Sequence, residues 1–460
     1  MISKNRADNR KMKENEIFEK APVSKAYFTM ALPVVLSMVV SLIYNMVDTY
    51  FIAGTGNTDL VAGVSLGAPV FTLMIALGDI FGLGGSSVIS RMFGKKQDDD
   101  GRRMSVFCFY AAILCGILVI IIMLAFRMPI LHMLGADEDT LCYASAYYTG
   151  IVIGAPFIIL SFTPSNLLRT EGFAKASMVG TILGAVVNMV LDPVFISLLG
   201  FGAAGAAIAT VTAQALSVVF AVMLLLKKDL PFAITKKDFR LNPQCRKFLK
   251  IGLPLALQEF LTQISFLALC AFVNRLGLEA SSGYGVACKI VNFAMLVPSS
   301  LMQSMASFVS QNIGAGKKKR AKQSMFTGIG VGLAVGCVVF VLVLFKGDVL
   351  CSAFSTDAAV IQNGFAYLKG FAPETLVTAI LFSMVGYFNG NNKTVWVMTQ
   401  GLIQTLLVRL PLAYFMSIQP NASLTKIGLA APVATTVGIV LNVGFFSYLN
   451  WAEQRRSILS

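Results

Sequence analysis

Two polar side chains lie one helical turn apart in an otherwise apolar stretch of the chain. Asn188 and Asp192 stand in the sequence GAVVNMVLDPVF, and residues four apart share one face of a helix. An aspartate at mid-membrane depth costs roughly 3 kcal/mol on insertion scales and usually serves an ion pathway or a proton relay. Asp48, with Tyr44 one turn before it in the first long apolar run, is the expected partner. We therefore expect a cation or proton site in a membrane transporter.

The composition indicates the kind of protein that must position this site. The chain has 460 residues, of which 56% are hydrophobic and only 13% charged, against about 25% charged residues in an average soluble domain. Apolar runs long enough to cross a ~30 Å hydrocarbon core recur along it, and none alternates as a barrel strand does. We predict an all-α polytopic membrane protein with spans near 26–53, 62–90, 104–126, 143–166, 176–199, 203–226, 248–273, 282–311, 323–345, 360–388, 395–417 and 428–450.

Basic residues are distributed unevenly between the two sides of these spans. Most of the 37 Lys and Arg fall in the two tails and in the loops after even-numbered spans, which places both termini in the cytoplasm. The net charge of +14 thereby needs no nucleic acid, and the basic run 317–322 is expected to touch anionic lipid. The first 25 residues have no cleavable signal pattern, so the expected location is the cell membrane.

Other kinds of chemistry find little support in the sequence. The eight cysteines form no CxxC pair, and His132 is the only histidine, so neither a zinc site nor a disulfide framework is expected. The chain contains no HExxH or GxSxG motif for hydrolysis and no GxxxxGK[ST] loop for ATP. We expect no enzymatic activity and no cofactor beyond a coupling ion.

The two halves of the chain repeat one another. KAYFTMALPVVLS matches RKFLKIGLPLALQ, Pro193 matches Pro411 at an offset of 218, and AAIAT ending at Thr210 matches APVAT ending at Thr435. Because six spans is an even number, both halves enter from one side, and a pseudo-twofold axis along the membrane normal should relate two homologous six-helix bundles. The expected divisions are a cytoplasmic tail at 1–25, an N-lobe at 26–226, a linker at 227–247, a C-lobe at 248–450 and a cytoplasmic tail at 451–460.

Glycines and prolines at mid-depth are candidate hinges. They are Gly82, Gly84 and Gly85, with Pro156, Pro298 and Pro373 in three other spans. Breaks of this kind are tolerated in lipid where neighbouring helices or a cavity satisfy the freed carbonyls. The alternative for the glycines and for the prolines is close helix packing through small residues.

These residues resemble the multidrug and toxic compound extrusion (MATE) family of cation-coupled exporters, from about residue 26 to residue 450. The resemblance rests on the double repeat, Leu32-Pro33 and Leu253-Pro254, the stretch SRMFGK, and the set Asp48, Asn188, Asp192 and Thr210. It implies an antiporter with two six-helix bundles. In one branch of the family a helix 1 aspartate, a helix 5 asparagine and aspartate, and a helix 6 threonine form the N-lobe cation site, and all four positions are filled here.

The chemistry of that set suits either H⁺ or Na⁺. Two carboxylates that share a dehydrated pocket cannot both ionise cheaply, so Asp48 and Asp192 are expected to hold a proton, or Na⁺ among oxygen ligands that include Asn188 and Thr210. The alternative is a purely structural hydrogen-bond network. Tyr44 and Asn45 lie alongside, as gating or supporting groups or as ordinary packing.

Further residues are candidates for the substrate cavity, because a lipophilic cation is held by apolar contacts and one negative charge. Asp79 and Glu374 either line this cavity or pair structurally with a basic residue of the spans (Lys289, Lys369 or Arg409). Glu259 either contributes to coupling or substrate charge or lies nearer the interface. Met295, Met302 and Gln303 either line the cavity or form a packing stripe.

The expected function is export of cationic or amphipathic small molecules in exchange for H⁺ or Na⁺ by alternating access, by a protein that is a monomer in contact with membrane lipid. A lipid-linked saccharide flippase of the same wider superfamily is the alternative. Such a protein should prefer a cationic cavity for pyrophosphate, whereas acids outnumber bases in these spans.

Overall fold

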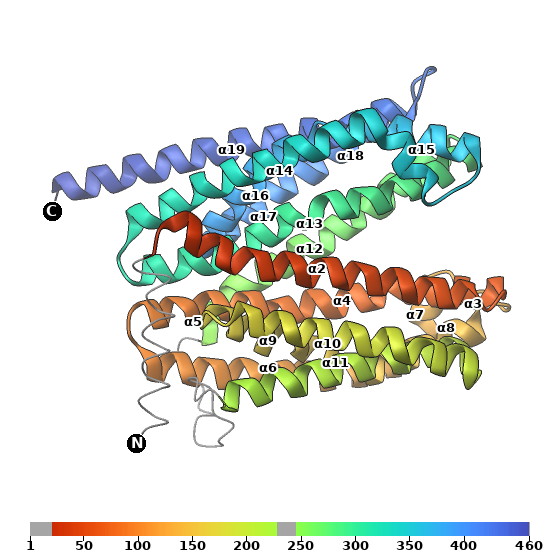
Figure 1. The fold of residues 1–460 in the computed structure, drawn as a ribbon, viewed down its shortest axis with the longest axis horizontal. Helices are drawn as coiled ribbons and strands as arrows, with labels where there is room; N and C mark the ends of the chain where they lie inside the picture. The colour runs from red at the N-terminus through yellow and green to blue at the C-terminus, as the bar shows by residue number, and fades with distance from the viewer. Residues whose placement is uncertain (1–20, 228–244, 460) are drawn as a thin grey trace. The chain divides into compact units, whose positions relative to one another are not determined.

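The computed structural model describes residues 21–227 and 245–459, and these ranges are helical, with no strand among them. Ten of the described helices are long and apolar enough to cross a membrane. Two further pairs of helices each pass the same test together, which gives up to twelve spans. The predicted all-α membrane fold is therefore confirmed (Figure 1). The predicted linker and N-terminal tail lie almost entirely outside the described residues.

The chain forms two compact units, and the first extends to Ala256 and includes Ser310–Lys318. Its helices begin with the long α2 and end with the first part of α12 (Cys245–Asn274). They are α2 (Val23–Ala53), α3 (Thr58–Leu66), α4 (Ala68–Asp79), the π-helix η1 (Ile80–Gly84), α5 (Gly85–Gly94), α6 (Asp98–Ala125), α7 (Arg127–Met133), α8 (Leu141–Ile153), α9 (Ala155–Thr170), α10 (Ala174–Asp192), the π-helix η2 (Pro193–Leu198) and α11 (Gly202–Lys227).

The second unit comprises Leu257–Val309 and the chain from Lys319. It contains the rest of α12 and most of α13 (Leu278–Gly314), followed by α14 (Lys318–Ser352), α15 (Ala358–Phe371), α16 (Glu374–Gly390), α17 (Thr394–Leu402), the π-helix η4 (Ile403–Arg409), α18 (Leu410–Ser417) and α19 (Leu424–Leu459). Helix α19 continues through the residues predicted as a tail from 451. The apolar pattern ends near 450 but the helix does not, because helical geometry needs no apolar sequence beyond the membrane.

The backbone repeats along with the sequence. Residues other than glycine rarely adopt a positive backbone φ angle. Such angles occur at Gly56 and Gly277, at Lys96 and Gly316, and at Gly172 and Asn392. Each pair is separated by 220 or 221 positions in the chain, close to the offsets of the sequence repeat. The two halves therefore share their turns as well as their apolar runs.

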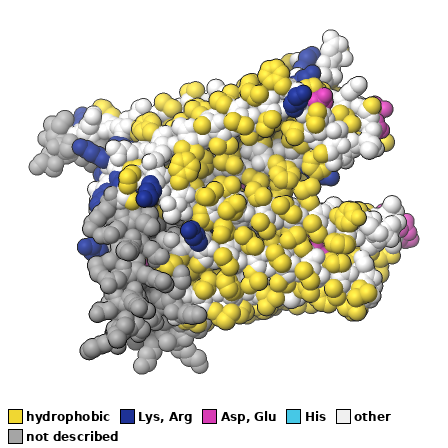
Figure 2. Space-filling view, in the orientation of Figure 1, with side chains coloured by type: hydrophobic (Ala, Val, Ile, Leu, Met, Phe, Trp, Pro, Cys, Tyr) yellow, Lys and Arg dark blue, Asp and Glu magenta, His cyan; other side chains and the backbone are white. Residues whose placement is uncertain are grey.

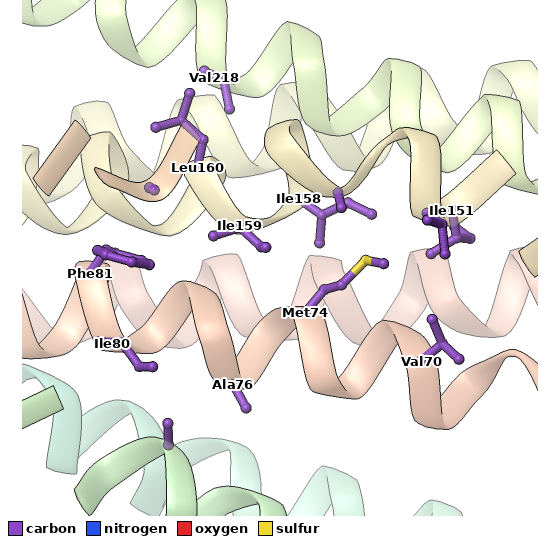
Figure 3. Packing of buried hydrophobic residues seen from close by; sticks show 14 of the residues in the cluster. Val70, Met74, Ala76, Ile80, Phe81, Ile151, Ile158, Ile159, Leu160 and Val218 are labelled. Carbon is purple, nitrogen blue, oxygen red and sulfur yellow. The ribbon is translucent and has the colours of Figure 1, made fainter. Parts of the chain in front are cut away.

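The core of the first unit lies between the helices of its second and fourth spans. Figure 3 shows Met74 of α4 and Phe81 of η1 on the side that faces Ile158 and Ile159 of α9, and these four side chains are at most 7% exposed. Burial of this kind adds van der Waals contact between helices, which is what holds them together in lipid. The outer flanks are apolar too: Figure 2 shows hydrophobic side chains along the visible sides of the helices, with charged ones toward their ends.

Breaks in the helices occur at two of the predicted proline positions. Helices α8 and α9 meet at 47° beside Pro156, and α15 and α16 meet at 49° beside Pro373. Pro298, by contrast, lies inside the unbroken α13. Gly84 packs on the backbone of Gly252, where a Cβ on Gly84 would lie 2.6 Å from the Gly252 Cα. The glycines near η1 thus serve close packing, and η1 itself is a π-helical interruption of the second span.

Two glycines of α19 provide a test of this close packing in the second unit. A Cβ on Gly428 would lie 2.6 Å from the Tyr367 carbonyl oxygen of α15, whereas a Cβ on Gly444 would meet nothing within 4 Å. We expect Gly428→Ala to lower stability by roughly 1–3 kcal/mol through overpacking. Gly444→Ala should be neutral or stabilising by about 1 kcal/mol, as in an ordinary helix interior. Thermal unfolding of both variants in detergent is the measurement, and equal Tm values would contradict the packing role.

Candidate functional site

The predicted cation site is divided between two helices that pack against each other in the first unit. Asp48 lies near the end of α2, one turn after Tyr44, and α2 packs along α10. Asn188 and Asp192 lie in the last two turns of α10. The apolar residues around them make both segments helical, and the π-helix that starts at Pro193 ends the regular hydrogen-bond pattern directly after Asp192.

Burial and hydrogen bonding give this pair of helices an excess of acceptors. Asn188 and Asp192 are 1% and 0% exposed, and the Asn188 Nδ2 donates to the Asp192 Oδ1 at 3.2 Å. Three buried oxygens have no hydrogen-bond donor among the described residues: Asp48 Oδ1, Asn188 Oδ1 and Asp192 Oδ2. A buried acceptor without a donor is costly, so these oxygens call for a proton or a cation.

The two carboxylates are also close enough to interact. Asp48 and Asp192 lie within electrostatic range of each other, and Tyr44 lies within range of both. Like charges in such a site repel, which favours one shared proton or one cation over two free anions. The structure thus brings together Asp48, Asn188, Asp192 and Tyr44, the first three as predicted ligands and Tyr44 beside them.

Tyr147 of α8 is a neighbour of this site that the sequence did not reveal. It is 8% exposed and lies within electrostatic range of Asp48, Asp192 and Tyr44. Its ring packs on Gly67, where there is no room for a side chain. A tyrosine in an apolar run gives no sequence signal of its own, because only the packing of α8 in the unit brings it near the carboxylates.

The remaining predicted members lie differently. Thr210 is buried on α11, a helix that packs on both α10 and α8, but no hydrogen bond joins it to Asp192 among the described residues. Asn45 is exposed on α2, and its backbone carbonyl accepts a hydrogen bond from Thr49 Oγ1 at 2.8 Å. No hydrogen bond joins Asn45 or Thr210 to the carboxylates among the described residues, so their part in the site stays a prediction.

The oxygen atoms of this site could ligate a proton or a small monovalent cation. In the described part of the chain no group of three or more His, Cys, Asp or Glu side chains is arranged to hold a metal ion. The buried atoms without a hydrogen-bond donor are carboxylate and amide oxygens, which suit H⁺ or a hard cation such as Na⁺. Two acids with neutral oxygens provide enough negative charge for one monovalent cation.

Asp79 has a basic neighbour other than those considered from the sequence. It ends α4, which packs on α9, and it interacts electrostatically with Arg169 near the end of α9. Both side chains are half-buried. The candidate partners Lys289, Lys369 and Arg409 all belong to the second unit, and both the pairing with one of them and a place in the substrate cavity stay predictions for Asp79. Sequence alone could not connect two spans that touch only through folding.

Glu374 lies at the start of α16 in the second unit and is held by two hydroxyl groups. Its Oε1 accepts hydrogen bonds from Thr378 Oγ1 at 2.9 Å and from Thr435 Oγ1 at 2.8 Å. Arg409 lies within electrostatic range of it, as one of the predicted pairings requires. Glu374 is thus a member of a polar network inside the unit.

Comparison with known proteins identifies the family to which this architecture belongs. The MatE family model matches the chain twice, over residues 33–194 and 254–415. The chain belongs to the MATE family. The multidrug export protein MepA of Staphylococcus aureus strain N315 is 29% identical over 401 residues, which cover 85% of this chain and 88% of that protein. Its counterpart in Staphylococcus saprophyticus is 28% identical over 399 residues, with the same coverage of both chains.

A solved structure described as an outward-facing multidrug resistance MATE transporter of the MOP superfamily shares the fold. Its TM-score is 0.88 at 23% identity, over 97% of this chain and 98% of that one. The two matches of the family model fall in the two halves of the chain, which confirms the repeat of this MATE protein. Members of the family are membrane transport proteins, in agreement with the absence of enzyme motifs from the sequence.

The other cavity candidates of this MATE transporter belong to the second unit. Glu259 is exposed on α12 and accepts a hydrogen bond from Gln263 Nε2 at 3.2 Å. Met302 is half-buried on α13, with its carbonyl against Gly386 of α16, and Met295 packs against the core of the second unit. A place in the substrate cavity stays a prediction for both methionines. Gln303, half-buried on the same helix, stays a candidate.

Proposed function

We propose that this MATE transporter is a secondary active antiporter that exports cationic or amphipathic small molecules in exchange for H⁺ or Na⁺ by alternating access. The observation that carries the proposal is the buried carboxylate pair, Asp48 and Asp192, with three acceptor oxygens that lack a donor among the described residues. Similarity to the multidrug export protein MepA supports drugs as substrates.

The residues of the site have different roles in coupling. Binding of one H⁺ or Na⁺ at Asp48 and Asp192 removes the repulsion between them and lets α2 and α10 pack closely. Asn188 holds one oxygen of Asp192 and offers its own carbonyl oxygen to the cation. Release of the cation restores the repulsion, so each state of the site favours a different arrangement of α2. A ligand shifts such an equilibrium only by its difference in affinity for the two arrangements.

The free energy of the available ion gradients limits how far this exchange can drive substrate export. One charge crossing ~100 mV is worth about 2.3 kcal/mol, and one pH unit about 1.4 kcal/mol. Exchange of one H⁺ for one monovalent drug cation cancels the electrical contribution, so the chemical gradient alone would drive export. A neutral substrate would gain both contributions.

Efflux from proteoliposomes tests the proposal directly. The purified protein would be reconstituted with a fluorescent cationic dye, and a pH gradient and a Na⁺ gradient would be imposed separately. We expect one of the two gradients to drive dye transport against its concentration gradient. Transport driven by neither gradient would overturn the antiporter proposal. A lipid-linked saccharide instead of a dye would test the flippase alternative, which the family relatives do not favour.

The proposed orientation places both termini in the cytoplasm. In a cysteine-free variant, Glu138→Cys and Lys319→Cys would introduce single thiols at two exposed positions on opposite predicted sides. We expect a membrane-impermeant maleimide to label Glu138→Cys in intact cells, and Lys319→Cys only after permeabilisation, because of the excess of basic residues on the cytoplasmic side. The reverse labelling pattern would refute this topology.

A further inference from the structure

A row of aromatic rings joins α17 to the last turns of α19 in the second unit. Trp396 of α17 stacks on Phe445 of α19 with ring centres 4.1 Å apart, and Phe445 stacks on Tyr448 at 6.3 Å. Trp451 follows Tyr448, again at 6.3 Å. These four residues form what we call the aromatic row, and it contains both tryptophans of the chain.

The aromatic row runs from the inside of the unit to its surface. Trp396 Nε1 donates to Asn442 Oδ1 at 2.9 Å, and Asn442 is fully buried. At the other end Tyr448 and Trp451 are 58% and 54% exposed. The guanidinium carbon of Arg455 lies 5.1 Å from the centre of the Trp451 ring. The row therefore has a fixed inner end and an outer end where exposed rings and a cation lie together.

This outer end lies where α19 leaves the apolar part of its sequence. The candidate span is Leu424–Ala452, so Trp451 is at its end and Arg455 is about one turn beyond it. A helix rises ~1.5 Å per residue, which puts Arg455 about 6 Å past Trp451 along the axis. Tryptophan and tyrosine favour the interface between hydrocarbon and headgroups. The rings are thus expected at the interface and the guanidinium at the level of the lipid phosphates.

A second source of positive charge adjoins this end of α19. Lys322 of α14 donates to Asn450 Oδ1 at 2.5 Å, and Lys319, one turn earlier on α14, is exposed. Both lysines belong to the basic run 317–322, from which contact with anionic lipid is predicted. The hydrogen bond to Asn450 therefore holds the positively charged start of α14 at the residue that precedes Trp451.

The internal repeat indicates that the fold itself does not require the aromatic row. At the offset of 225 that relates Thr210 to Thr435, α11 carries the counterparts of the three rings of α19. They are Phe220, Met223 and Leu226, and at the offset of 218 Met178 is the counterpart of Trp396. Only one of these four residues is aromatic, although α11 is long and apolar enough to span the membrane. The row is thus particular to the second unit.

We propose that the outer end of the aromatic row binds the headgroup of one anionic phospholipid. The phosphate binds Arg455, whose planar fork of N–H groups matches phosphate oxygens. Tyr448 and Trp451 contact the apolar part of the same lipid next to its headgroup. Exposed rings beside the cation favour a lipid over a soluble anion, because only the lipid supplies apolar contact. This site concerns the membrane and not the exported molecule, so it goes beyond the proposed function.

Quenching of tryptophan fluorescence by brominated lipid measures occupancy of this site. In the Trp396→Phe variant, Trp451 is the only tryptophan. The variant would be reconstituted in nanodiscs of phosphatidylcholine with a small fraction of brominated phosphatidylglycerol, or of brominated phosphatidylcholine as the neutral reference. We expect the anionic lipid to be enriched roughly fivefold at Trp451, as for one basic residue that attracts one anionic headgroup. Equal quenching by the two lipids would overturn the proposal.

Two matched variants separate a specific site from general attraction between charges. Arg455→Gln in the same background should abolish most of the preference for the anionic lipid. Arg103→Gln removes an equal charge from an exposed position in the first unit and should leave the preference unchanged. Equal losses in the two variants, or no loss in Arg455→Gln, would contradict a site at the aromatic row.

A second measurement needs no tryptophan substitution and serves if Trp396→Phe does not fold. Native mass spectrometry of the otherwise unchanged protein, released from a mixture of the same two lipids without bromine, counts the lipids that stay bound. We expect Arg455→Gln to retain less phosphatidylglycerol than the unchanged protein and than Arg103→Gln. Equal retention by all three proteins would refute the proposal. Dye efflux plays no part in either readout, so its failure would concern the proposed function alone.

Discussion

Neutralising either carboxylate of the first unit is expected to abolish gradient-driven efflux at near-normal protein levels. Asp48→Asn or Asp192→Asn removes a charge that is buried or half-buried between α2 and α10, which relieves desolvation instead of creating it. The site would lose its response to H⁺ or Na⁺, since one carboxylate can no longer share the ion with the other. We expect dye transport driven by a gradient to fall roughly tenfold or more, equivalent to ~1.4 kcal/mol of lost coupling.

The pattern among several variants makes this prediction specific. The two losses should be strongly non-additive, because either change already destroys the shared site. Asn188→Ala and Thr210→Ala should be milder and shift the pH or Na⁺ dependence, since each removes one neutral group worth about 1–3 kcal/mol. The measurement is dye efflux against external pH at matched protein levels, with the exposed Asp139→Asn as control. Full gradient-dependent transport by Asp48→Asn would refute the site.

Much of the fold follows from the sequence because few backbone conformations are stable in lipid. An apolar run of about 20 residues must be a helix, since its backbone can find no other donors in the membrane. The offset of 218 between Pro193 and Pro411 likewise predicted a repeat that the paired turns at Gly56 and Gly277 confirm. The spacing of Asn188 and Asp192 predicted a shared face, and the hydrogen bond between them confirms it.

The sequence could not reveal contacts that depend on how whole helices pack. Tyr147 reaches the carboxylates because α8 packs on α11, and Arg169 reaches Asp79 because α9 packs on α4. Neither residue is distinguished by its neighbours in the chain. The π-helices add a second obstacle, since the wider turn of η4 changes which face its later side chains occupy.

Asp79 provides the second large expected effect, because it lies within electrostatic range of Arg169 and a structural role is expected from this. The close approach of the two spans holds it against α9: a Cβ on the adjacent Gly78 would lie 2.6 Å from the Phe162 ring. Asp79→Asn would remove the negative charge that interacts with Arg169, and loss of this interaction at a half-buried position should cost about 1–3 kcal/mol. We expect a clear fall in Tm in detergent, together with equal losses of transport for cationic and neutral substrates.

The double variant Asp79→Asn/Arg169→Met decides between a structural and a substrate-binding role for this acid. Because the two side chains interact, the effects of the two substitutions should be non-additive, so part of the lost stability should return. Glu138→Gln, an exposed acid of the same unit, is the matched control and should leave Tm unchanged. If Asp79 attracted substrate instead, Asp79→Asn would keep its Tm and lose only cationic substrates, and the second substitution would restore nothing. Measuring Tm beside transport of one cationic and one neutral dye therefore separates the two roles in a single set of proteins.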